Sequence, residues 1–135
     1  MKGENFITSA HTHCGLSSAQ KKQIDKYLGS YLSNCKLLKL ERYEAEFLGT
    51  SLSSHTASEI SREAPMARAK MFEVRHFILD LPYSDERIFL YYHYVRGESV
   101  EKCAELLDTS RRSAFRLKNA ALALAYLEAH RRGVV

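Results

Sequence analysis

Residues 84–127 read SDERIFLYYHYVRGESVEKCAELLDTSRRSAFRLKNAALALAYL, and this stretch decides the fold. Its apolar residues recur every three or four positions, broken at R-G-E-S (96–99) and L-D-T-S (107–110). This spacing is typical of amphipathic helices, and Ser99 and Ser110 are residue types that cap helix N-termini. We therefore predict a short helix, a turn of about three residues and a second, longer helix.

Two helices joined in this way form a helix-turn-helix, whose second helix enters the major groove of DNA with its N-terminal end first. Ala104 is small enough for two helices to cross closely, and Asp108 tolerates the positive φ expected in the turn. Ala114 and Leu117 mark the buried line of the second helix. The outward positions are the predicted base contacts: Arg112, Ser113, Phe115, Arg116 and Asn119. Three further residues suit phosphate contacts: Ser110, Arg111 and Lys118.

The chain of 135 residues carries a formal net charge of +4, which is unevenly placed. Residues 111–132 contain six lysines and arginines but one acidic residue, Glu128. Basic residues clustered in one segment are typical of proteins that bind a polyanion. The sequence therefore predicts double-stranded DNA as the partner of this segment.

Upstream, residues 17–48 predict one long amphipathic helix. Its apolar positions recur at spacings of four and three residues, which is also the pattern of a coiled coil. We expect them to form an association face: Ile24, Leu28, Tyr31, Cys35 and Leu38. A homodimer would double the length of DNA that is read, and the alternative is that this face packs on its own domain.

The other segments complete an all-α organisation. Residues 1–16 show no periodicity and are expected to be disordered. Small polar residues predict a linker over 49–58. Residues 59–135 are then a compact helical DNA-binding domain, with the helix-turn-helix at 99–132.

Two more helices are expected within this domain. The first spans residues 60–80, with Pro65 in its first turn, where proline is tolerated. The second spans residues 85–96, with Ser84 as its cap and Gly97 in the left-handed conformation that ends a helix.

Residues 84–127 also resemble a known family. The acidic start, the aromatic-rich helix before R-G-E-S and the run V-E-x-x-A-E-L-L-x-x-S-R-x-x-A-x-R-L are similar to the C-terminal DNA-binding module of sigma factors. They resemble still more closely the sigma-like phage regulators of the ArpU and RinA type. The resemblance implies a phage or mobile-element regulator of transcription that acts on promoter DNA in a bacterial host, with RNA polymerase as a further partner. The first thirty residues lack the pattern of a secretory signal, so the cytoplasm is the expected compartment. Asp108 and Thr109 depart from the commoner Gly-Val or Gly-Ile turn, and Ser113 and Phe115 replace residues that are often charged.

Composition and length exclude several classes of protein. With 45% hydrophobic and 27% charged residues, the chain has ordinary globular usage, and 135 residues are too few for two full-sized domains. No apolar run approaches the roughly 18 residues that cross a bilayer, so no membrane partner is expected. The three cysteines lack a C-x-x-C pair, which fits free thiols in a reducing compartment.

Catalytic and cofactor motifs are absent from the sequence, so we predict neither an enzyme nor a cofactor. His11, His13 and Cys14 are metal-ligand types but lack a second pair, and no metal is expected. The aromatic residues of 89–94 have helical spacing and are expected in the core rather than as a base-stacking platform. The rival function is a sigma-like adaptor that contacts RNA polymerase or a sigma factor without binding DNA.

Overall fold

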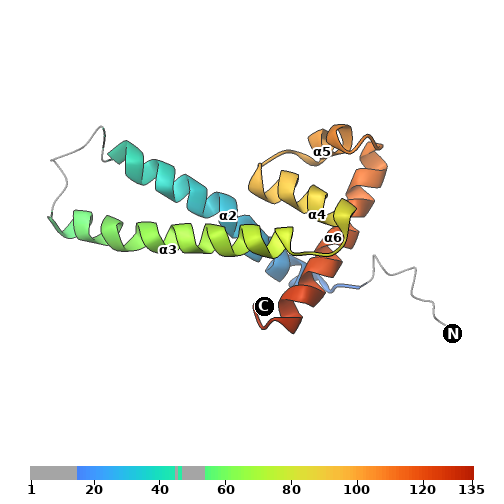
Figure 1. Ribbon diagram of the computed structural model, residues 1–135, viewed down its shortest axis with the longest axis horizontal. Helices are drawn as coiled ribbons and strands as arrows, with labels where there is room; N and C mark the ends of the chain where they lie inside the picture. The colour runs from blue at the N-terminus through green and yellow to red at the C-terminus, as the bar shows by residue number, and fades with distance from the viewer. Residues whose placement is uncertain (1–14, 45, 47–53) are drawn as a thin grey trace.

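The computed structural model describes residues 15–44, 46 and 54–135, and these residues form helices without any strand. The all-α prediction with a long N-terminal helix is confirmed. In chain order the elements are α2 (Ser18–Tyr43), α3 (Ser54–Leu79), α4 (Ser84–Leu90), the π-helical turn η4 (Tyr91–Val95), α5 (Val100–Leu106) and α6 (Arg111–Arg131) (Figure 1).

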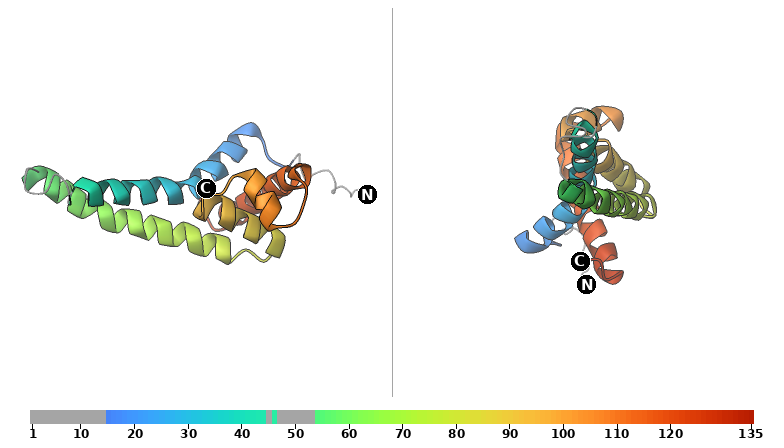
Figure 2. Two further views of the ribbon diagram at one scale, coloured as in Figure 1. Left: turned by 90° about the horizontal axis from the view of Figure 1, so that it is seen from above. Right: turned by 90° about the vertical axis from the view of Figure 1, so that its left-hand side faces the viewer.

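The molecule has a long helical hairpin and a compact head. α2 runs outward from the head and α3 returns beside it, so that the two helices lie antiparallel over most of their length (Figures 1 and 2). The head contains α4, η4, α5 and α6, together with the start of α2 and the end of α3.

The core sits where the hairpin enters the head. α2 contributes Ile24 and Leu28, both fully buried, and α3 contributes Val74 and Ile78. Phe89 from α4 is also fully buried in this cluster, as the aromatic pattern predicted. Because α2 supplies part of the same core, the long helix is not separate from the C-terminal domain.

The expected association face on the first helix needs correction. Ile24 and Leu28 are completely buried within one chain, and Tyr31 packs partly buried against the same core. Cys35 and Leu38 are half-buried. The alternative prediction, that this face packs on its own domain, is therefore correct for Ile24 and Leu28. A four-three repeat packs equally well against a helix of its own chain.

The expected start of α3 was also wrong. The helix begins at Ser54, so residues 54–58 of the predicted linker are helical, while 49–53 lie outside the described residues. Pro65 lies inside the helix rather than in its first turn. A proline there removes one backbone hydrogen bond, and packing along α2 compensates.

The observed start of the described chain and the ends of α2 differ from the predicted boundaries by a few residues. Gly15 and Leu16 are described, and Leu16 packs against the core, whereas residues 1–14 lie outside the described part. Ser17, one residue before α2, caps the helix by accepting a hydrogen bond from the Gln20 amide. The α-helical part of α2 ends at Tyr43, and Glu44 and Glu46 continue with π-helical geometry. The predicted last residues, 47 and 48, lie outside the described residues.

The aromatic-rich stretch follows the prediction with one exception. α4 and η4 together cover the expected helix, and Gly97 ends it at φ +74°. Ser84, however, is the first helical residue, and the cap position is Tyr83, whose side chain makes no capping hydrogen bond. The acidic residues Asp85 and Glu86 stabilise the first turn electrostatically instead.

Candidate nucleic-acid interface

The turn between α5 and α6 closes as the sequence predicts. The Thr109 amide donates to the Ala104 carbonyl at 2.9 Å, and the Asp108 amide donates to the Glu105 carbonyl at 3.1 Å. These are the two hydrogen bonds of a Schellman motif, with Asp108 in the left-handed position at φ +53°. The last carbonyls of α5 are thereby satisfied, and the chain reverses within a few residues.

Serine caps start both helices of the pair. The Ser99 hydroxyl accepts from the Lys102 amide at 3.1 Å, and the Ser110 hydroxyl accepts from the Ser113 amide at 3.0 Å. Ala104 and Ala114 are buried in the core to which both helices contribute. With a capped start and small core residues, the first turns of α6 are held firmly at the edge of the head beside α5 (Figure 1).

Four of the five predicted base contacts lie on one exposed side of α6. Arg112, Arg116 and Asn119 are exposed and follow one another at spacings of four and three residues. Phe115, which is 40% exposed, borders them. The opposite side of the helix is buried through Ala114 and Ala121. The N-terminal half of α6 therefore presents two guanidinium groups, one amide and one aromatic ring to solvent.

Ser113, the fifth predicted base contact, is placed differently. Its side chain is half-buried, and its hydroxyl oxygen lies 3.0 Å from that of Ser110, from which it accepts a hydrogen bond. It lines a hollow of about 250 Å³ beside the turn, together with Asp85, Leu107, Asp108, Thr109 and Leu117. Ser113 thus faces the turn more than the solvent.

Arg111, a predicted phosphate contact, is engaged within the chain. Its Nε lies 3.0 Å from Oε2 of Glu101 on α5, and its guanidinium lies 5.6 Å from the centre of the Phe115 ring. Both charged side chains are at least half exposed, so such a pair contributes at most about 1 kcal/mol. Arg111 is therefore able to exchange Glu101 for another anion.

Lys118 lies beside two lysines of α2, Lys21 and Lys22, that the sequence did not predict as part of the site. It is half-buried on the flank of α6 and lines a hollow of about 330 Å³ with Ser18, Lys21, Lys22 and Asp25 of α2 and Leu122. Two lysines of α2 and one of α6 thus border the same hollow. The lysines of α2 lie off its apolar line, but no local pattern indicates which helix they approach.

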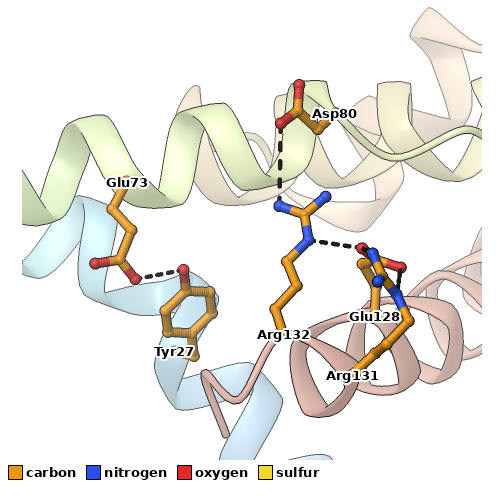
Figure 3. Close-up of polar contacts among 6 residues, drawn as sticks. All are labelled: Tyr27, Glu73, Asp80, Glu128, Arg131 and Arg132. Carbon is orange, nitrogen blue, oxygen red and sulfur yellow. Dashed lines mark hydrogen bonds and ion pairs between the residues drawn. The ribbon is translucent and has the colours of Figure 1, made fainter.

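Buried tyrosines hold the start of α2 in this position. The Tyr94 hydroxyl donates to Asp25. The Tyr27 hydroxyl donates to Oε2 of Glu73 at 2.6 Å (Figure 3). Burial, followed by these hydrogen bonds, raises the pKa of both tyrosines, which stay protonated donors. Lys21 and Lys22 are therefore carried on a helix that is fastened to the head.

The basic residues at the end of α6 have acidic partners. Glu128 bonds Arg131 through both carboxylate oxygens and accepts from Nε of Arg132 at 2.6 Å (Figure 3). Arg132 also lies 4.0 Å from Asp80, the residue directly after α3, and over the ring of Phe77. Hydrogen bonds from Arg131 and then Arg132 lower the pKa of Glu128 to about 2. The positive charge that remains open on α6 is thus concentrated in its first half.

His93 packs among the aromatic side chains of the head. His93 is half-buried, and its Nδ1 lies 2.7 Å from the Glu98 carbonyl; burial and, more weakly, the charge of Lys118 lower its pKa. Across the part of the chain that the structure describes, no three His, Cys, Asp or Glu side chains gather as a metal site would require. His11, His13 and Cys14 lie outside that part.

None of the helices in the described ranges 15–44 and 54–135 combines the length and the apolar character needed to cross a membrane. Comparison with known proteins found no matching family model, no matching curated protein and no matching solved structure.

Proposed function

We propose that the protein is a sequence-specific DNA-binding regulator of transcription, whose first half of α6 enters the major groove. One observation carries this proposal: a tight, capped turn presents Arg112, Arg116 and Asn119 together on the exposed side of a helix start. Helix-turn-helix proteins place their reading residues in this way. The sigma-like resemblance adds promoter DNA in a phage-infected bacterial cytoplasm as the setting.

Each exposed side chain has a matching chemistry in the groove. An arginine guanidinium donates two hydrogen bonds to O6 and N7 of guanine, and an asparagine amide pairs with adenine. Phe115 offers an apolar surface for a thymine methyl group. Arg112, Arg116 and Asn119 thus supply the specific contacts.

Phosphates are the proposed partners of the flanking groups. Lys118, Lys21 and Lys22 line one hollow beside α6, and Arg111 offers a guanidinium once it leaves Glu101. The start of α6 adds its own positive dipole end near Ser110. Such contacts fix the position of a protein on DNA without reading its sequence.

The test is a titration of labelled duplex DNA, followed by fluorescence anisotropy between about 50 and 200 mM salt. A pool of genomic fragments, enriched by repeated binding, is compared with random DNA. Arg112→Ala with Arg116→Ala removes the proposed reading groups. Arg42→Ala with Arg131→Ala removes the same charge from the far end of α2 and the far end of α6, and serves as the control.

Each bidentate contact contributes about 1–3 kcal/mol of discrimination, so the reading variant should lose about a hundredfold or more of its preference for enriched DNA. The control should keep that preference. Equal, weak binding of all fragments that ignores Arg112 and Arg116 would contradict the proposal. It would favour the rival function, an adaptor that contacts RNA polymerase without DNA, which a polymerase pull-down with the reading variant then checks.

A further inference from the structure

The side of α3 that faces away from the core carries a second apolar line. Ala67, Val74 and Ile78 point inward and are buried. On the opposite side, exposed residues recur at spacings of four, three, four and three, and we call them the α3 stripe: Pro65, Ala69, Phe72, His76 and Leu79. This is the spacing of a coiled-coil seam.

Two large apolar side chains of the α3 stripe are exposed to solvent. Phe72 is 65% exposed and Leu79 is 42% exposed. At its end the stripe borders a hollow of about 290 Å³, which Leu79 lines together with Arg75, Arg87, Ile88, Tyr91 and Tyr92. Exposed Phe72 and Leu79, at the spacing of a coiled-coil seam and beside this hollow, are typical of an interface with another protein chain.

Charges on the two flanks of the stripe indicate what covers it. Arg68 and Arg75, seven residues apart, lie on one flank, and both are exposed. Glu73 and Asp80, also seven residues apart, lie on the other flank, and their side chains are 48% and 62% exposed. One flank is thus basic and the other acidic with the same period.

This pattern is complementary to itself in one orientation. In a parallel coiled coil, each flanking residue meets the residue five positions later on the opposite flank of the second helix. Arg68 then faces the partner's Glu73, and Arg75 faces the partner's Asp80. In an antiparallel pair like flanks meet, so arginine would face arginine and carboxylate would face carboxylate.

The acidic flank already has contacts inside the chain, and these leave room for more. Glu73 accepts from Tyr27 and lies 3.6 Å from Lys70, and Asp80 lies 4.0 Å from Arg132. A carboxylate has about four acceptor positions, so an additional arginine can be accommodated at each.

We propose that the α3 stripe is a homodimer interface, on which the α3 helix of a second copy of this chain lies parallel to the first. Phe72, Leu79 and Ala69 form its apolar seam, and the Arg68 and Arg75 flank pairs with the partner's Glu73 and Asp80. A parallel arrangement places both heads at the same end of the paired helices. The proposal does not depend on whether α6 binds DNA.

The first test measures mass by sedimentation equilibrium of the full chain over a range of concentrations. Phe72→Glu is compared with Leu127→Glu, a matched control on α6 whose side chain is 63% exposed against 65% for Phe72. The wild type and the control should show the mass of two chains, whereas Phe72→Glu should be a helical monomer by circular dichroism. A monomeric wild type, or a dimer that Phe72→Glu leaves intact, would overturn the proposal.

The second test distinguishes a parallel from an antiparallel dimer by whether a double variant weakens or tightens dimerisation. Arg68→Ala with Arg75→Ala removes attraction from a parallel dimer, so the dissociation constant of the dimer should rise about tenfold. The same variant relieves arginine repulsion in an antiparallel dimer and would tighten it. A tighter dimer would overturn the parallel arrangement.

A cysteine introduced on the seam gives an independent check that needs no change in charge. In a Cys14→Ser, Cys35→Ser background, Ala69→Cys should form an intermolecular disulfide under mild oxidation, because equivalent seam residues of parallel helices come within disulfide range. Met66→Cys, 72% exposed but off the stripe, is the control and should crosslink far less. Equal crosslinking at both positions, or more at Met66, would contradict the proposed register.

Discussion

The two halves of α6 carry similar basic residues and use them differently. Arg112 and Arg116 in the first half extend into solvent. Arg131 and Arg132 at the end bind Glu128, and Arg132 also approaches Asp80. A count of charges along the sequence treats these residues alike. The neighbours in the fold decide which of them are open to a polyanion.

The largest expected effect concerns the apolar side of the second half. Leu122 is 1% exposed, so Leu122→Ala leaves a cavity in the core and should lower the free energy of unfolding by about 2–5 kcal/mol. Leu127→Ala, five residues on and 63% exposed, is the control and should change it by less than about 0.5 kcal/mol. Urea denaturation measures both. A small effect at Leu122 would contradict the burial of this half.

The second prediction compares how removing arginines from the start and from the end of α6 affects stability. Arg112→Ala with Arg116→Ala should leave stability within about 0.5 kcal/mol of the wild type, because both side chains are exposed. Arg132→Ala removes contacts with Glu128, Asp80 and Phe77 and should lower stability by about 1 kcal/mol. If both variants lose stability equally, the two halves do not differ as described. Thermal unfolding followed by circular dichroism checks this comparison.

Local signals in the sequence predicted the parts of the site that depend on a few neighbouring residues. Ser99 and Ser110 as caps, Asp108 at positive φ and Gly97 at the helix end are all confirmed. Each depends on backbone geometry within one turn, which a single residue type reveals.

The errors arose where distant segments meet. The repeat at Ile24 and Leu28 has the same spacing whether it packs within one chain or between two, so it could not distinguish these possibilities. The continuation of α3 through Pro65 depends on packing against α2. The approach of Lys21 and Lys22 to Lys118 depends on the tertiary fold as well.

The third prediction tests the turn between α5 and the first half of α6. Asp108 is a non-glycine residue with φ +53°, a conformation that glycine adopts without a steric penalty. Asp108→Gly should therefore stabilise the fold by about 0.5–1 kcal/mol, whereas Asp108→Ala should destabilise it. Chemical denaturation of both variants gives the comparison. A stabilising alanine would show that the left-handed conformation is not required.

The smallest expected effect is the pH dependence of stability that Glu128 gives to the end of α6. The pKa of Glu128 falls from 4.5 to about 2 because Arg131 and Arg132 bond the charged carboxylate. Its folded-state pKa is thus below its unfolded value, so the stabilisation is complete above pH 4.5 and is lost as pH falls toward 2. Glu128→Gln lacks this contribution, and its unfolding midpoint should fall less between pH 6 and about pH 3 than that of the wild type. Because the cluster is at the surface, about 0.5 M salt should reduce the difference. Parallel pH profiles for the two proteins would contradict the ion-paired arrangement, and with it the view that the open basic residues of α6 lie in its first half.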